Sequence, residues 1–466
     1  MGVPMNFQVV ILAGGTSKKL FPLVSKDVPK ALLPVANRPV LSYVLELLEA
    51  SNLKDLIVVV AGEDAAVRVG GWISGAYDDR LHVEVAAVPD DVGTAGALRA
   101  VAHHLTADDI LVVSGDLVCD VPPGAVAATH RRQEATVTAL LCTPPATGPS
   151  EGGSAAGGKD KAKRPGLVNV IGLDSTGQSL LFIASGAQVE KGLRIQRSLL
   201  RTAGQMEVHS DLVDAHLYAF KRTVLQDVLE QKPKIRSIKD DLVPYLVRSQ
   251  LRYGASSNNK TQTEEATNEI YALQKSDTWP SNQQIAGDPQ SHPLFSLGVS
   301  GWKSDANVLK CCAYIANKSK YCARLNSIQA FGDINRDVVG EATHLTGYTV
   351  SAHNNIVHPS AQHGSKTTIG PYCMLGDGSQ MGDKCSVKRS IVGRHCRIGS
   401  NVKIVNSVVM NHVTIEDGCL IQGSIVCSNV QLLERATLKD CQVGAGYIVA
   451  SGTEHRGEAL AKKEKA

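Results

Sequence analysis

Short apolar runs alternate with segments of helical period along the first half of the chain. The runs FQVVIL at 7–12, IVVV at 57–60 and TVTALLC at 136–142 contain few polar positions, which is typical of strands buried on both faces of a sheet. The segment 40–50 carries apolar residues on most faces of a helix. This alternation predicts a doubly wound, Rossmann-like α/β domain with a mostly parallel sheet.

A different period governs the last third of the chain, where one long or branched apolar residue recurs every six positions. From Leu375 onward the phase slips by one at every third step, so each repeat spans 17 residues, divided into six, six and five. A left-handed parallel β-helix has this pattern, because each coil contains three short strands with one inward apolar residue apiece. The expected inward residues are Ile369, Leu375, Met381, Val387, Val392, Ile398, Ile404, Val409, Ile415, Ile421, Val426, Leu432, Leu438 and Val443.

The two patterns divide the chain into two domains. Two polar segments, rich in small and charged residues, interrupt the first domain and are predicted to be mobile insertions at about 144–164 and 255–300. The expected boundaries are an α/β domain at 1–335, a linker at 336–351, a β-helix at 352–450 and a disordered tail at 451–466.

Composition and charge narrow the class of protein. The chain has 466 residues, and its net charge of +3 is too balanced to suggest electrostatic capture of nucleic acid or of an anionic membrane. No apolar run reaches membrane-spanning length. Eleven cysteines occur without a C-x-x-C pair, which favours reduced thiols in a cytosolic protein over a disulfide framework or a zinc site.

The strongest candidate for chemistry is the loop after the first strand, where residues 12–30 read LAGGTSKKLFPLVSKDVPK. Gly14 and Gly15 fall at the carboxyl end of that strand, where open α/β sheets bind ligands. Adjacent glycines let backbone N–H groups approach phosphate oxygens, because no Cβ holds the phosphate off. A glycine pair alone is more often a tight turn flanked by solvated lysines than a phosphate loop.

The whole segment resembles the signature of the sugar-1-phosphate nucleotidyltransferases, LAGGxGTRLxPLTxxxPK followed by KxLxPVxxxPxL. This chain ends the first part at Lys30 and continues KALLPVANRPVL. The third glycine of the signature is Ser17 here, its threonine is Lys18, and its catalytic arginine is Lys19. An ammonium group cannot supply the planar, two-pronged phosphate clamp of a guanidinium, so the resemblance implies an inherited pocket with weakened chemistry.

Two further landmarks resemble the same family. The segment PDDVGTAGALR at 89–99 is similar to the part that receives the base and ribose, and Asp116, after the strand ILVVSG, resembles the first magnesium-binding aspartate. The family's second ligand lies in a W-x-D-x-G segment, and GWKSD at 301–305 matches it too poorly to be assigned. We therefore predict no catalytic residue and no metal ligand, but a vestigial nucleotide pocket of Gly14, Gly15, Lys19, Lys30, Gly93, Thr94 and Asp116.

Both domains together resemble the gamma subunits of translation initiation factor 2B, above all in the runs SVVMNHVTIEDGCLIQGSIVCSN and LKDCQVGAG. This resemblance implies a non-catalytic subunit without cofactor in a guanine-nucleotide exchange complex. The implied partners are the epsilon and other subunits of initiation factor 2B, and initiation factor 2 itself. The chain lacks a G-x-x-x-x-G-K-[ST] loop, so it is not expected to be a GTPase.

Two alternative functions stay open at this point. One is an active nucleotidyltransferase that forms GDP-mannose or a similar nucleotide sugar. The other is a regulatory sensor that binds a nucleotide sugar without turnover, since Gly14, Gly15, Lys30, Thr94 and Asp116 would suffice for weak binding. No direct contact with nucleic acid or with a membrane is expected.

Overall fold

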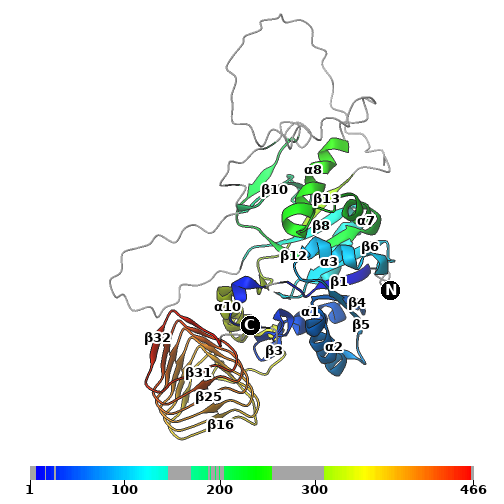
Figure 1. The fold of residues 1–466 in the computed structure, drawn as a ribbon. Coiled ribbons are helices and arrows are strands. Elements are labelled where there is room, and N and C mark those ends of the chain that lie inside the picture. Colours follow the sequence, from blue (N-terminus) through cyan, green and yellow to red (C-terminus); the bar gives the residue numbers. More distant parts are fainter. Residues whose placement is uncertain are drawn as a thin grey trace, which may run out of the picture.

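The first domain is built around a seven-stranded sheet (Figure 1). Strands β6, β1, β4 and β5 run parallel, β12 is antiparallel to both of its neighbours, and β13 is parallel to β8. The strands in spatial order are β13 (Cys311–Ile315), β8 (Val137–Cys142), β12 (Val213–Lys221), β6 (Asp109–Ser114), β1 (Phe7–Leu12), β4 (Asp55–Ala61) and β5 (His82–Val88).

This computed structural model describes residues 7–15, 17–25, 28–144, 169–186, 204–253 and 309–462, with residues 189, 195 and 199. The two predicted insertions lie almost entirely outside the described residues. Within that part of the chain, no helix has the length and apolar character needed to cross a membrane.

Helices cover both faces of the sheet, which confirms the predicted doubly wound fold. Val9 and Ile11 point to one face and Val10 to the other, and all three are fully buried. One face packs against α1 (Val40–Ala50), α2 (Glu63–Tyr77) and α4 (Pro123–Arg132). The other packs against α3 (Gly93–Ala100), α7 (Arg222–Gln231) and α8 (Val243–Tyr253).

Smaller elements complete this domain. Strands β7 (Leu117–Cys119) and β14 (Cys322–Arg324) form a separate two-stranded antiparallel sheet. Short helical turns are η1 (Lys18–Leu20), η2 (Lys30–Leu32), η3 (Ala102–His104) and η4 (Ile238–Leu242). The remaining strands are β2 (Pro34–Val35), β3 (Arg38–Pro39), β9 (Val170–Leu173), β10 (Leu180–Ala184) and β11 (Glu207–His209).

The second domain is a parallel β-helix whose three sheets stack one strand per coil (Figure 1). Val387 pairs with Ile404 and Ile404 with Ile421, so the predicted 17-residue repeat is confirmed. All of the predicted inward residues except Ile369 are buried, and Ile369 is partly buried.

The strands of the β-helix fall into three sheets. The first contains β15 (Ile356–Val357), β18 (Met374–Leu375), β21 (Ile391–Val392), β24 (Val408–Val409), β27 (Ile425–Val426), β30 (Gln442–Val443) and β33 (Ala459–Leu460). The second contains β16 (Gln362–His363), β19 (Gln380–Met381), β22 (Arg397–Ile398), β25 (Thr414–Ile415), β28 (Gln431–Leu432) and β31 (Ile448–Val449). The third contains β17 (Thr368–Ile369), β20 (Ser386–Lys388), β23 (Lys403–Val405), β26 (Leu420–Gln422), β29 (Thr437–Lys439) and β32 (Glu454–Arg456).

A left-handed residue recurs at one corner of successive coils, where the chain must turn sharply between two strands. The stacked positions have φ between 56° and 72°. Glycine and asparagine adopt this conformation readily, whereas a longer side chain costs about 1 kcal/mol. The stacked residues are Lys384, Asn401, Gly418, Arg435 and Gly452.

The structure corrects two predicted boundaries. Helix α10 (Ile328–Val339) continues through residue 335, so the first domain ends at Val339 and the linker, with η6 (Thr343–Leu345), begins at Gly340. The segment predicted as a disordered tail from 451 instead forms β32 and β33, which extend the β-helix as far as Leu460. The second correction arises because stacking on the preceding coil orders residues whose own sequence pattern is weak.

The two domains share an apolar joint. The outward residues of the first β-helix sheet, including Ile391 and Val408, are buried against the first domain. Their partners include Leu20 and Leu23 from the glycine-rich loop and Phe331 from α10. An apolar joint of this kind holds the domains together more firmly than the polar interfaces that permit domain motion.

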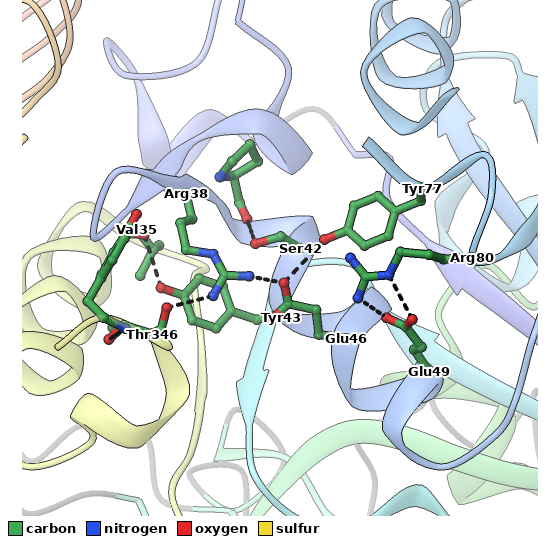
Figure 2. Close-up of polar contacts among 11 residues, drawn as sticks. Val35, Arg38, Ser42, Tyr43, Glu46, Glu49, Tyr77, Arg80 and Thr346 are labelled. Atoms are coloured by element: carbon green, nitrogen blue, oxygen red, sulfur yellow. Dashed lines mark hydrogen bonds and ion pairs between the residues drawn. The ribbon is translucent and has the colours of Figure 1, made fainter. Parts of the chain in front are cut away.

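Polar contacts surround this joint, as Figure 2 shows for Arg38. The Arg38 guanidinium donates to the carbonyl of Thr346 at 2.9 Å, pairs with Glu46, and lies over the ring of Tyr43. The hydroxyl of Tyr77 also donates to Glu46, at 3.5 Å. Arg38 thereby ties the linker to α1, and Glu46 links α1 to α2.

Candidate functional site

Gly14 and Gly15 line a cavity at the carboxyl end of β1, as the sequence predicts. A Cβ on Gly14 would lie 2.7 Å from the backbone nitrogen of Ala61, so only glycine fits between β1 and β4. Gly15 has φ of +125° and open space above it. The cavity has a volume of about 150 Å³, and Gly93 and Thr94 line its opposite side. Four of the seven predicted pocket residues therefore meet in one place.

The opposite wall is held by backbone contacts between α3 and the segment before η4. Gly93 has φ of +73°, and a Cβ there would lie 2.4 Å from the carbonyl oxygen of Arg236. The same carbonyl accepts a hydrogen bond from the N–H of Ala95 at 2.9 Å. The Thr94 hydroxyl accepts the N–H of Ile238, also at 2.9 Å. This wall is fixed by internal hydrogen bonds, and one of them already uses an acceptor site of Thr94.

The structure does not bring Lys19 to this cavity, which corrects its predicted place in the pocket. Lys19 lies exposed in η1, and no side chain in the described part of the chain pairs with it. The neighbouring Leu20 and Leu23 are buried in the joint with the β-helix. Burial of these two leucines turns the loop toward the second domain and leaves Lys19 in solvent.

Lys30 and Asp116 meet in a separate ion cluster that also contains Arg324. The Arg324 guanidinium grips the Asp116 carboxylate with two hydrogen bonds, from Nε to Oδ1 at 3.0 Å and from Nη2 to Oδ2 at 3.1 Å. Lys30 pairs with Oδ2, and the Ser114 hydroxyl donates to Oδ1 at 2.6 Å. Burial alone would raise the pKa of Asp116, but the charges of Arg324 and Lys30 outweigh it and hold that pKa well below its usual range.

His216 occupies an irregular position beside this cluster, where the register of β12 shifts between Asp214 and Tyr218. It has φ of +57°, a left-handed conformation that is uncommon for a non-glycine residue. Its Nε2 is buried and has no hydrogen-bond partner in the described part of the chain. Burial, reinforced by the charge of Arg324, lowers the pKa of His216 well below its usual value, so the ring is neutral at pH 7.

Asp214 and Tyr218 complete the buried polar group. The Tyr218 hydroxyl donates to Asp214 Oδ2 at 2.5 Å, and the N–H of His216 donates to Oδ1 at 2.7 Å. Burial raises the pKa of Asp214 despite these two hydrogen bonds. The cavity next to Asp214 and Lys239 has a volume of only about 10 Å³, roughly the room for one water molecule.

The sequence alone does not identify Arg324 or His216 as site residues. Arg324 lies 208 positions from Asp116, and nothing in its local sequence connects the two. His216 stands in an apolar run, VDAHLYAF, that predicts only a strand. The only sign of a special role in the sequence is that this polar ring interrupts the apolar run. The segment 301–305, the weak match to a second metal ligand, lies outside the described residues.

Two sequence families match this chain, one in each domain. Residues 8–164 match the family described as nucleotidyl transferase, and residues 352–454 match the family described as the EIF2B subunit epsilon LbH domain, which supports the left-handed assignment of the β-helix.

Full-length relatives cover both domains. The translation initiation factor eIF2B subunit gamma of Dictyostelium discoideum is 31% identical over 84% of this chain and 88% of its own length. The same subunit of Schizosaccharomyces pombe is 30% identical over 99% of this chain and 91% of its own length. The mannose-1-phosphate guanyltransferase of Yarrowia lipolytica is 29% identical, but over only 28% of this chain and 36% of its own length.

Proposed function

This chain belongs to the family of translation initiation factor eIF2B gamma subunits, and we propose that it works as a non-catalytic subunit that pairs with the epsilon subunit to promote GDP/GTP exchange on initiation factor 2. Membership in this family makes it part of a complex with other eIF2B subunits. The free state of all eleven cysteines supports a cytosolic location.

The observation that carries the non-catalytic proposal is that the Asp116 carboxylate is already paired with two cations of the same chain. A nucleotidyltransferase of the resembled family would use this carboxylate to hold Mg²⁺, which prefers carboxylate, phosphate and water oxygens. Here Lys30 and Arg324 of the same chain already satisfy both oxygens. No group of three or more potential ligands occurs among the described residues. A site with one carboxylate and two cations does not fit Mg²⁺.

The space around His216 supports the same conclusion. His216 fills space beside the ion cluster, and the remaining cavity near Asp214 holds no more than about one water. A sugar phosphate would have to displace a buried side chain and compete with the Asp116 carboxylate for Lys30 and Arg324. We infer that the active-transferase alternative is the weaker one.

The glycine-lined cavity supports a narrower binding role. Its volume of about 150 Å³ is below the roughly 300 Å³ at which ligand pockets usually begin, so it is too small for a whole nucleotide sugar. Gly14 and Gly15 are both exposed where they line it. We propose weak, metal-independent binding of a nucleoside monophosphate there, in place of a nucleotide-sugar sensor.

Reconstituted exchange tests the main proposal. The epsilon subunit is assayed for GDP release from initiation factor 2 with and without this chain, and we expect several-fold faster release when the chain is present. In parallel, the chain is supplied with GTP, mannose-1-phosphate and Mg²⁺. Pyrophosphate release at ordinary enzyme rates, about 1 s⁻¹ or more, would overturn the non-catalytic assignment.

Thermal unfolding with added guanosine monophosphate tests the cavity. A ligand at 100 times its Kd stabilises the folded chain by about 2.7 kcal/mol, which a melting curve resolves. Ala97 lines the cavity from α3, so Ala97→Leu should abolish the stabilisation. Ala100→Leu, on the exposed side of the same helix, is the matched control and should keep it. Equal shifts in both variants would place the ligand elsewhere.

A further inference from the structure

Three free thiols from three different strands gather next to the ion cluster. Cys119 ends β7, Cys322 begins β14, and Cys142 ends β8. Each side chain is only 3% exposed, and all three belong to one hydrophobic cluster. The proposed exchange function uses none of them.

The backbone sets two of these cysteines directly opposite each other. Cys119 and Cys322 are register partners in the antiparallel β7–β14 pair. The flanking Asp120 N–H donates to the carbonyl of Tyr321 at 3.1 Å, which makes that neighbouring pair a hydrogen-bonded one. Hydrogen-bonded and non-hydrogen-bonded residue pairs alternate along an antiparallel ladder. Cys119 and Cys322 therefore form a non-hydrogen-bonded pair, whose Cα atoms lie about 4.5 Å apart. Disulfides form at Cα separations of about 4.4–6.8 Å.

We propose that Cys119 and Cys322 are a redox modification site, at which a peroxide converts the two thiols into a cross-strand disulfide. One sulfur attacks the peroxide, the O–O bond breaks, and a sulfenic acid and one water form. The second sulfur attacks the sulfenic sulfur, the S–S bond forms, the S–O bond breaks, and a second water leaves. The two thiols lose two electrons and two protons, and one peroxide is reduced to two waters.

The geometry favours Cys119 over Cys142 as the partner of Cys322. The Cys322 thiol interacts with the thiols of both Cys119 and Cys142, but the Cys142 sulfur is also directed to backbone carbonyls, at 3.8 Å from Val213 O and 4.0 Å from Cys322 O. No strand pairing aligns Cys142 with Cys322, since β8 pairs with β12 and β13.

The disulfide would hold in place the strand β14, which carries Arg324 of the ion cluster. In the described part of the chain, β14 pairs with β7 alone, and it bears Arg324 two residues after Cys322. Helix α10, which packs in the joint with the β-helix, begins four residues later at Ile328. Oxidation would therefore hold Arg324 on Asp116 and stabilise the start of α10.

The test treats the full-length chain with hydrogen peroxide, blocks the remaining thiols, digests without reductant and identifies linked peptides by mass spectrometry. We expect a Cys119–Cys322 crosslink at least tenfold more abundant than any other pair, and its loss on reduction. Cys142→Ala should keep the crosslink, whereas Cys119→Ala should abolish it. The adjacent buried pair Cys311 and Cys312 is an internal control for unfolding.

A second measurement distinguishes a site from incidental chemistry. Hydrogen exchange of β7 and β14 should slow several-fold in the oxidised chain and return with dithiothreitol, while exchange in the β-helix stays unchanged. A Cys142–Cys322 crosslink, mixed crosslinks that include Cys311 or Cys312, or thiols that stay fully reduced in the folded chain would each overturn the proposal.

Discussion

Replacement of Arg324 by methionine is the most direct perturbation of the ion cluster. The Asp116 side chain is 4% exposed and that of Arg324 is 20% exposed, so the pair lies in a poorly solvated site. Loss of one partner from such a pair costs about 3–5 kcal/mol, because an uncompensated charge stays buried. Lys30 remains to compensate part of the Asp116 charge. We therefore expect Arg324→Met to lower the free energy of unfolding of the first domain by about 2–3 kcal/mol.

The assay is thermal unfolding of the full-length chain, with hydrogen exchange of β6 and β7 to assign the effect to this domain. For a domain of this size, 2–3 kcal/mol corresponds to a decrease in Tm of roughly 5–10 °C. Arg80→Met is the matched control, because Arg80 pairs with Glu49 through the same bidentate geometry but at the exposed surface (Figure 2). Its Tm should not change measurably.

The effect should also depend on pH in a defined direction. The folded-state pKa of Asp116 is lowered, so the stabilisation from its ion pairs is fully present above the unfolded pKa of about 3.9 and is lost as pH falls below it. The difference between wild type and Arg324→Met should stay constant from pH 7 to about pH 5 and shrink below about pH 4. An effect as small as that of Arg80→Met, or one undiminished at low pH, would refute the cluster as described.

Three further perturbations test the rest of the molecule. Val409→Asp places an unpaired charge in the β-helix core and should lower the free energy of unfolding by several kcal/mol, so that a pull-down with the epsilon subunit no longer captures the chain. Gln431→Asp, on an exposed face, should change neither the stability nor the pull-down. Lys19→Ala should leave assembly and GDP exchange unchanged, and Lys19→Arg should not generate pyrophosphate release, because the side chain does not reach the glycine-lined cavity. Arg38→Met leaves the partly exposed Glu46 and the Thr346 carbonyl without their shared donor, so it should lower the free energy of unfolding by about 1–2 kcal/mol, measured by urea titration.

The sequence by itself determined the elements whose signal is local and periodic. The buried runs predicted β1, β4 and β8 closely, and helix α1 spans the predicted residues 40–50. The six-residue step predicted the β-helix and its inward column, because one inward residue per strand is a requirement of the coil itself. Gly14, Gly15, Gly93 and Thr94 could be grouped in advance because strand ends in an open sheet share one edge.

Only the tertiary structure decided what surrounds those elements. The contact between Asp116 and Arg324 joins residues 208 positions apart, and no local pattern encodes a pairing of that range. The exclusion of Lys19 from the pocket follows from burial of Leu20 and Leu23 against a domain that begins more than 300 residues later. The last coil is ordered by stacking on the coil before it, although its own sequence carries weak apolar signal. In each case the structure is decided by contacts between separate segments of the chain. Each segment, taken alone, contains only ordinary residues, so no local sequence pattern reveals the contact.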